Sequence, residues 1–358
     1  MKCKLSDICS FRKGKVEVEN LNAKNYISTE NMLPNKCGIT EASSLPTVSL
    51  TQEYNSGDVL VSNIRPYFKK IWQAKYDGGC SNDVLVFVPK PNTDKDFLYY
   101  VLADDDFFTY SMATSKGTKM PRGDKTSIMQ YEVPLIDLQV QKKIASVLKA
   151  LDEKIKLNNE INNNLEQQAQ AIFDNMFPNI SNGENTIGDI ITPKRGKGLL
   201  SKNAVFGNVP VVAGGLEPST YHNTANTVAP VLAISASGAN AGFVSLWNTP
   251  IWSSDSSFID SSMTDYVYFW YVLLKKRQRE IYDSQTGSAQ PHIYPQHIAA
   301  MSISDLNFDD VHNYTSIVTP IFEMIGHNKD ENARLATTRD TLLPKLMSGE
   351  LDVSDIEI

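Results

Sequence analysis

Few side chains in this 358-residue sequence could hold a metal ion or act as a nucleophile. The four cysteines lie in the first quarter of the chain without a CxxC pair, and no histidine precedes His222. Zinc sites need cysteine and histidine at short, fixed spacings, so the sequence predicts no metal site. We expect ordinary reduced thiols at Cys3, Cys9, Cys37 and Cys80.

Catalytic motifs are missing as well. The sequence has no GxxxxGKS or GxxxxGKT phosphate loop, no GxGxxG after a predicted strand, no HExxH and no GxSxG. All five histidines lie in the second half, so no histidine site can be common to both halves. The consecutive acids Asp104, Asp105 and Asp106 are typical of a solvated face. No residue is therefore predicted to be catalytic.

Two related segments are more informative. GTKMPRGDKTSI, residues 117–128, and GSAQPHIYPQHI, residues 287–298, share a glycine, a hydroxyl residue beside it, a proline four positions on and an isoleucine eleven positions on. Glycine and proline can hold a loop rigid while the side chains around them differ. The two loops would then present different hydrogen-bond donors from one common frame.

The same offset of 170 residues continues downstream, and upstream it drifts as insertions would make it. YVL at 100–102 matches YVL at 271–273, and LSDICSFRKGK at 5–15 matches IGDIITPKRGK at 187–197. Further matches are Asn158, Asn162 and Leu165 with Asn328, Asn332 and Leu335. The order of parts is the same in both copies, so the chain is predicted to be two tandem modules, each closed by a helix.

The body of each module is predicted to be α+β. Short β-rich runs such as DVLVFV (83–88) and APVLAIS (229–235) are separated by turn-forming residues. Each copy also has one helical candidate, DFLYYVLADDDFF in the first and DYVYFWYVLLKKRQREIY in the second.

The closing helices carry apolar residues at alternating steps of four and three, the spacing of a coiled-coil seam. A seam of about 33 residues spans roughly 50 Å at 1.5 Å per residue. Each helix could pack on its own module, but we favour an antiparallel pair. In such a pair Asn158 lies level with Asn332, and Asn162 lies level with Asn328. Polar residues in a seam set register and orientation at some cost in stability.

Composition and charge fit a two-domain protein. The formal charge of the whole chain is −7, but residues 1–177 have no net charge, with 22 basic and 22 acidic residues. No apolar run is long enough to span a membrane. The start lacks the apolar core of a secretory signal, so a cytosolic location is expected. The predicted parts are a first module at 1–137, a central helix at 138–177, a second module at 178–307, a C-terminal helix at 308–350 and an acidic tail at 351–358.

The two closing helices resemble the spacer helices of the specificity subunit of type I restriction-modification systems. The segments that carry this resemblance are LQVQKKIASVLKALDEKIKLNNEINNNLEQQAQAIFDNMF and RLATTRDTLLPKLMSGEL. In the modules, GDVLVSNIRPYFKK, GTKMPRGDK and GSAQPHIYPQHI are similar to stretches of that family's target recognition domains. The resemblance covers nearly the whole chain in the expected order.

The resemblance implies a fold of two tandem target recognition domains separated by two long helices that pair as an antiparallel coiled coil. It also implies sequence-specific binding to double-stranded DNA, with each domain reading one half of a bipartite, asymmetric site. Methylation subunits would modify adenine with S-adenosylmethionine, and restriction subunits would use ATP and Mg²⁺ to cleave. The specificity subunit itself would bind no cofactor and catalyse nothing.

Two other functions stay open at this point. A duplicated adaptor that binds protein without DNA specificity would have the same internal repeat. An enzyme with a degenerate active site is also possible, but the missing cofactor motifs disfavour it.

Candidate DNA contacts are basic or polar groups beside glycine that recur in both copies, since phosphates attract cations and base edges need polar side chains. Two basic turns are candidates for phosphate contacts, or they are ordinary surface loops. They consist of Arg12, Lys13 and Lys15 in the first copy and of Lys194, Arg195 and Lys197 in the second. The paired loops are candidates for base reading, or structural turns. Their donors are Lys116, Thr118, Lys119, Arg122 and Lys125 in the first, and Gln290, His292, Tyr294, Gln296 and His297 in the second.

The remaining candidates are specific to one module. Arg65, Lys69 and Lys70 have no basic counterpart in the second copy, where SASGANAGF takes their place. The basic cluster at residues 275–279 aligns with the acids at 104–106. It could contact phosphate, or it could simply be the solvated end of a helix.

Overall fold

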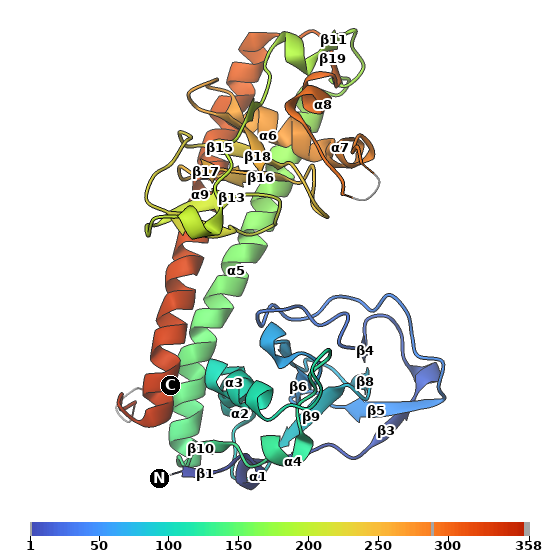
Figure 1. Cartoon of the computed structure of the whole chain (residues 1–358), viewed down its shortest axis with the longest axis vertical. Coiled ribbons are helices and arrows are strands. Elements are labelled where there is room, and N and C mark those ends of the chain that lie inside the picture. Colours follow the sequence, from blue (N-terminus) through green and yellow to red (C-terminus); the bar gives the residue numbers. More distant parts are fainter. Residues whose placement is uncertain (1, 288–289, 354–358) are drawn as a thin grey trace. The chain divides into compact units, whose positions relative to one another are not determined.

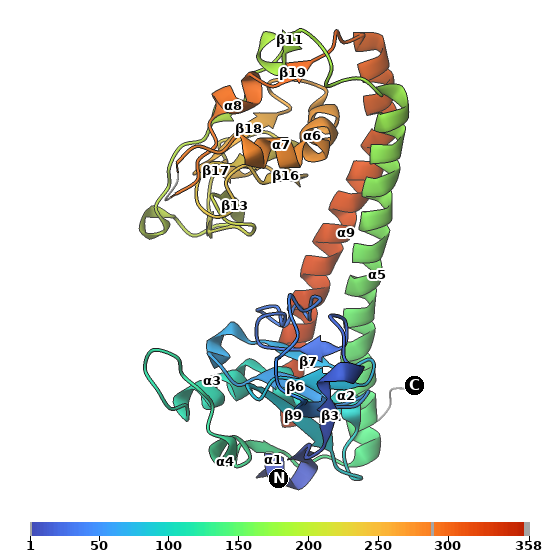
Figure 2. The ribbon, with the colours of Figure 1, turned by 90° about the vertical axis from the view of Figure 1, so that its right-hand side faces the viewer.

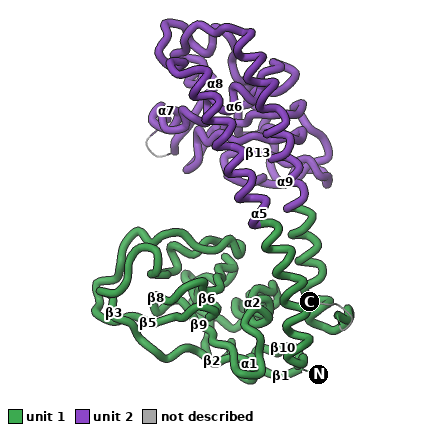
Figure 3. Tube along the Cα trace, turned by 180° about the vertical axis from the view of Figure 1, so that it is seen from behind, with its two compact units in different colours: residues 1–155, 333–358 green, residues 156–332 purple. Residues whose placement is uncertain are grey.

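The computed structural model describes residues 2–287 and 290–353. The chain divides into two compact units, residues 1–155 with 333–358 and residues 156–332 (Figure 3). The division falls inside both long helices, whereas the sequence prediction places module boundaries at the helix ends. Residues 288 and 289 of the second loop and residues 354–358 of the predicted acidic tail lie outside the described residues. Among the described helices, none is both long and apolar enough to cross a membrane.

Unit 1 is built on a four-stranded antiparallel sheet with the order β2-β9-β6-β7. Alternate residues of its strands face two different cores, as the two-residue period of a strand requires. One core contains Val59, Val61, Leu85 and Phe87 and is covered by helices, while the other contains Leu60, Val84 and Val86. The strands are β2 (Cys9–Phe11), β6 (Val59–Ser62), β7 (Ile71–Gln73) and β9 (Val84–Pro89).

A second sheet, β3-β5-β8-β4, closes the outer core of unit 1, and a two-stranded ribbon, β1-β10, ties its start to its end. Their strands are β1 (Lys2–Lys4), β3 (Lys15–Glu17), β4 (Tyr26–Ile27), β5 (Leu50–Tyr54), β8 (Gly78–Cys80) and β10 (Glu132–Pro134). The short helices are α1 (Leu5–Ile8), η1 (Val18–Asn20), η2 (Pro66–Phe68), α2 (Lys95–Ala103), α3 (Asp105–Ala113) and α4 (Lys125–Ile128).

Unit 2 repeats this plan, as Figures 1 and 2 show. Its main sheet has the order β12-β18-β15-β16, beside the sheet β14-β13-β17 and the ribbon β11-β19. The strands are β11 (Asn185–Thr186), β12 (Lys194–Arg195), β13 (Val209–Val212), β14 (Thr220–His222), β15 (Val231–Ser235), β16 (Val244–Trp247), β17 (Trp252–Ser253), β18 (Ser256–Asp260) and β19 (Ser302–Ile303). The short helices are η3 (Ile187–Asp189), η4 (Ser201–Asn203), α6 (Val267–Lys276), α7 (Gln278–Asp283) and α8 (Pro295–Ala299).

The single helix predicted in each module is wrong in one respect, because each is two helices. In unit 1, Asp104 has extended backbone angles and its carboxylate accepts the N–H of Asp106, so it ends α2 and caps α3. In unit 2, α6 ends at Lys276, and the guanidinium of the next residue, Arg277, is buried and donates to Glu280 and to the carbonyl of Ser302. The chain turns at both points so that each second helix packs on its own sheet.

The two long helices are α5 (Leu138–Met176) and α9 (Phe308–Ser348). Within each unit they lie side by side and antiparallel (Figure 1). They also pack on the module cores, through Ile144, Leu148 and Leu346 in unit 1 and through Phe173 and Phe322 in unit 2. The two packing modes considered for the sequence therefore occur together.

The four seam asparagines meet at the predicted levels, all within unit 2. The amide of Asn158 donates to Oδ1 of Asn332 at 2.9 Å, and the amide of Asn328 donates to Oδ1 of Asn162 at 2.8 Å. Asn158 and Asn162 are buried. Oδ1 of Asn158 has no hydrogen-bond partner in the described part of the chain, which costs stability. Their role in setting register remains a prediction.

Candidate nucleic-acid interface

The two related loops have the same backbone frame. In the first, the N–H and C=O groups of Lys116 and Arg122 bond to each other at 2.9 and 3.0 Å. In the second, Thr286 and His292 do the same at 3.0 and 2.8 Å. Gly117 and Gly287 both have φ of +92°, a conformation that residues with a Cβ rarely adopt. The shared glycine thus starts the same turn in both copies.

Each loop is anchored to the chain that leaves the central strand of its sheet. The N–H of Arg65, after β6, donates to the carbonyl of Pro121 at 2.8 Å, and the N–H of Gly238, after β15, donates to that of Pro291 at 3.1 Å. Arg65 and Gly238 are equivalent and both have positive φ, 49° and 82°. The shared proline carbonyl is therefore a docking point of the loop in both copies.

Two basic side chains of the first loop form ion pairs with acids of the same module. Lys116 pairs with Asp124 at 2.6 Å, and Arg122 lies 3.3 Å from Asp83. The Lys116 ammonium and the N–H of Ser127 lower the pKa of Asp124 to about 2. Lys119 and Thr118 are exposed, and within residues 2–287 and 290–353 Lys119 has no ion-pair partner. The ammonium of Lys125 lies 6.0 Å from the centre of the Phe11 ring.

The second loop displays rings and amides instead of cations. His292 and Tyr294 are stacked with ring centres 6.0 Å apart, and Nδ1 of His297 accepts the N–H of Tyr294 at 3.3 Å. Gln290 and Gln296 are exposed. Glutamine amides can both donate to and accept from base edges, so this surface could distinguish bases without strong phosphate attraction.

The basic turns are divided between internal ion pairs and exposed lysines. Arg12 donates to both carboxylate oxygens of Asp58 at 2.5 and 2.9 Å, and its side chain is only 18% exposed. Hydrogen bonding to Asp58 raises the pKa of Arg12. Arg195 pairs with Asp255 at 2.6 Å. A phosphate contact by either arginine would require it to leave its carboxylate. Lys13, Lys15, Lys194 and Lys197 are exposed, and within the described ranges none has an ion-pair partner.

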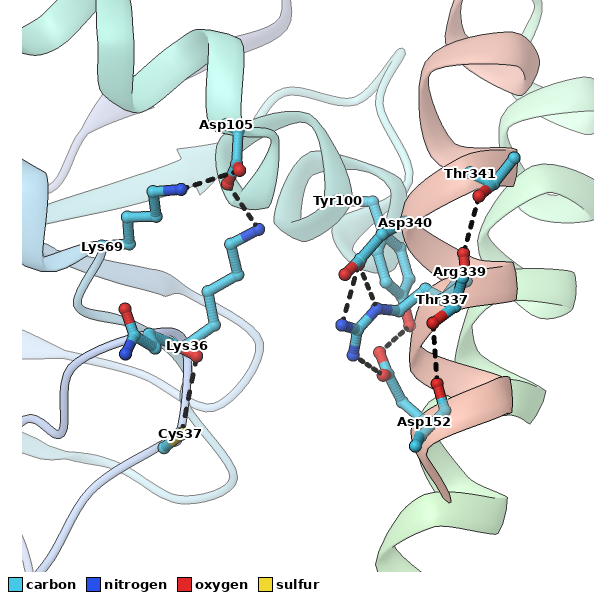
Figure 4. Close-up of polar contacts among 12 residues, drawn as sticks. Lys36, Cys37, Lys69, Tyr100, Asp105, Asp152, Thr337, Arg339, Asp340 and Thr341 are labelled. Atoms are coloured by element: carbon cyan, nitrogen blue, oxygen red, sulfur yellow. Dashed lines mark hydrogen bonds and ion pairs between the residues drawn. The ribbon is translucent and has the colours of Figure 1, made fainter. Parts of the chain in front are cut away.

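The candidates specific to the first module are also engaged. Asp105 holds Lys69 at 2.7 Å and Lys36 at 2.9 Å (Figure 4), and Lys70 donates to the carbonyl of Thr29 at 2.6 Å. Burial lowers the pKa of Lys70. Nε of Arg65 is buried and, among the described residues, has no hydrogen-bond partner. The basic cluster at 275–279 is structural at Arg277, and Lys276 pairs with Asp174.

A further exposed group was missed at the sequence level. Phe206 is 96% exposed, on the loop between η4 and β13. It borders an open cavity of about 570 Å³ that is also lined by Ser201, Asn208, Thr220 and Tyr221. In Figure 2 this loop lies on the side of unit 2 away from α5 and α9. A signal was present in the sequence, since residues 190–216 contain four cations and no acid.

The described residues contain no group of three or more His, Cys, Asp or Glu side chains placed to hold a metal ion. All four cysteines are free thiols, and burial raises the pKa of Cys9 and of Cys80 to about 12. The chemistry that the two loops can offer is therefore hydrogen bonding and charge.

Known proteins share both the sequence and the fold. A family model described as the type I restriction modification DNA specificity domain matches residues 1–167. The MjaIX specificity subunit of Methanocaldococcus jannaschii is 25% identical over 312 residues, which cover 75% of this chain and 72% of that protein. The HindI specificity subunit of Haemophilus influenzae is 31% identical over 166 residues, 42% of this chain and 35% of that protein.

The fold itself matches a solved structure. The type I restriction-modification S subunit from M. genitalium superposes with a TM-score of 0.60 at 19% identity, covering 97% of this chain and 96% of that one. The two repeated modules, the paired helices and these similarities agree. Residues 1–167 thus match the type I restriction modification DNA specificity domain, and the chain is similar in sequence to specificity subunits of type I restriction-modification systems.

Proposed function

We propose that each module of this chain reads one half of a bipartite, asymmetric duplex site, with the loop at 116–125 acting in the first module and the loop at 286–297 in the second. This proposal is supported by the family model that matches residues 1–167, which describes a DNA specificity domain, and by relatives that are named specificity subunits. The assignment of one half-site to each module is our extension to this protein.

The observation that carries this proposal is the common loop frame with different side chains. Both loops are closed by the same pair of backbone hydrogen bonds and anchored through the same proline carbonyl. The first offers lysines and an arginine, and the second offers glutamines, histidines and a tyrosine. Reading two different half-sites requires a constant docking geometry and variable donors.

We further propose that the chemistry belongs to partner subunits. Methylation subunits would bring S-adenosylmethionine, and restriction subunits would bring ATP and Mg²⁺, so this chain would act only as the recognition part. The absence of catalytic motifs in the sequence supports this division. No observation favours the protein-binding adaptor. Because its substrate would be DNA inside the cell, we place the protein in the cytoplasm.

The test is a genome-wide map of N6-methyladenine in the native host with and without this gene. We expect the deletion to remove methylation from one gapped, asymmetric motif, and a plasmid copy of the gene to restore it. An unchanged map, together with a purified complex whose binding to duplex DNA does not weaken as salt is raised, would contradict the proposal.

A further inference from the structure

In unit 1 the two long helices are joined by an ion pair, at a level where the repeat places apolar residues in unit 2. Arg339 of α9 donates to Asp152 of α5 at 2.6 Å, and the hydroxyl of Tyr100 donates to the other oxygen of Asp152 at 2.7 Å (Figure 4). Asp340, the next residue of α9, also accepts from Arg339. The side chains of Arg339 and Asp152 are only 25% and 30% exposed, so each depends on the other.

The equivalent level of unit 2 is apolar. The offset of 170 residues maps Asp152 to Phe322 and Arg339 to Ala169. Phe322 and Ala169 are 1% and 0% exposed and belong to one core. Phe322 packs against Tyr271, the counterpart of Tyr100, with ring centres 5.6 Å apart. One level thus holds two paired charges, and its counterpart holds a large ring and a small methyl group in one core.

The apolar and asparagine levels of the seam would allow either helix to pair with its own copy on a second chain. Both helices carry apolar residues at the same steps, and both carry two asparagines at the same places. In a pair of two α5 helices with the same register, Asn158 would face Asn162 of the second copy. Asparagine therefore faces asparagine in either arrangement, so this level cannot decide which helix α5 takes as its partner.

The level of Arg339 does differ between the arrangements. In a pair of two α5 helices, Asp152 would face Ala169 of the second copy and lose its cation. In a pair of two α9 helices, Arg339 would face Phe322 of the second copy and keep only Asp340. Each self-pair thus leaves a partly buried charge without its main counterion, and it does so twice because the pair is symmetric.

We propose that the Asp152 and Arg339 pair selects the partner of each helix, so that α5 pairs with α9 of the same chain and the two halves of the repeat reject their own copies. This selection is independent of what the modules bind. Its consequence is that each helix pair joins the two different modules of one chain, whereas self-pairing would join the same module of two chains.

The experiment compares full-length variants that are coexpressed as two differently tagged copies. Asp152→Arg places two guanidinium groups at the same level of the native pair, whereas in a pair of two α5 helices the introduced guanidinium would face only Ala169. We expect copurification of the two tags to rise about tenfold or more over wild type, and concentration-dependent dimers in analytical ultracentrifugation. Adding Arg339→Asp restores opposite charges and should return both measurements to wild type.

Glu160→Arg is the matched control, because Glu160 lies exposed on α5 with Lys156 as its neighbour, and it should stay monomeric. If Asp152→Arg prevents folding, Arg339→Gln provides a milder loss of the same pair and should give a smaller rise in copurification. Monomeric Asp152→Arg or Arg339→Gln protein with lowered melting temperature alone would overturn the proposal, as would a double variant that dimerises like the single one.

Discussion

Among individual residues, acids of the same module pair with five of the cations proposed to meet DNA. Asp58, Asp83, Asp105, Asp124 and Asp255 each lie within ion-pair distance of one of these arginines or lysines. Such pairs keep long side chains in a defined place, and they cancel charge at a distance. In the proposed function, this arrangement would let a chain of net charge −7 present ordered donors to DNA.

Lys119 is exposed in the first loop and, among the described residues, no acid pairs with it. We expect Lys119→Ala to weaken duplex binding by the assembled complex and to reduce the slope of log affinity against log salt by about 1, the effect of losing one phosphate contact. Lys156→Ala, on the exposed side of α5, is the control. Equal affinities and slopes would remove Lys119 from the interface.

Arg12 is expected to affect stability instead. Its loss would leave the carboxylate of Asp58, which is 4% exposed, without a counterion. Because Arg12 is partly exposed, we expect Arg12→Ala to cost about 2–3 kcal/mol of unfolding free energy. That corresponds to a fall in melting temperature of roughly 4–12 °C. Lys13→Ala should melt like wild type, and an Arg12→Ala protein that melts normally but binds DNA poorly would identify Arg12 as a phosphate contact.

At the scale of elements, the helix pair combines apolar packing with two kinds of polar level. The asparagines occur in both helices, while the arginine level has no charged counterpart in the other half of the repeat. A symmetric polar level can set the register of any pair that these helices form, and an asymmetric level can also set the partner. The asparagine level would therefore set the register of the helix pair, and the arginine level would set which helices pair.

The asparagine level can be tested directly with Asn158→Leu combined with Asn332→Leu. We expect the double variant to gain about 1–2 kcal/mol, because it removes a buried unpaired oxygen, and to show several species in ultracentrifugation, because register is no longer specified. Asn163→Leu, at an exposed position of α5, should change neither property. Unchanged melting and a single species for the double variant would argue against a register role.

At the scale of the whole molecule, two modules of the same fold should contribute separately to one recognised sequence. We expect Gln290→Ala with Gln296→Ala to relax one half of the methylated motif and to leave the other half intact, since both side chains belong to the second module. Mapping N6-methyladenine in cells that carry the variant gives the result. Relaxation of both halves at once would show that the modules do not read independently.

The sequence alone determined the duplication, the α+β class of the modules, the two long helices and the levels at which the asparagines meet. Each of these follows from periodicity or from a repeated spacing, and these properties are local and additive along the chain. The common frame of the two loops was also predictable, because glycine and proline restrict the backbone wherever they occur.

Which of the candidate cations are free of ion pairs depends on the folded chain. Arg12 meets Asp58, 46 residues away, and Arg339 meets Asp152, 187 residues away, and no local pattern relates such positions. The exposure of Phe206 likewise depends on whether distant segments of the chain pack over the ring. Charge pairing and burial depend on contacts between distant segments, and those contacts exist only once the chain has folded.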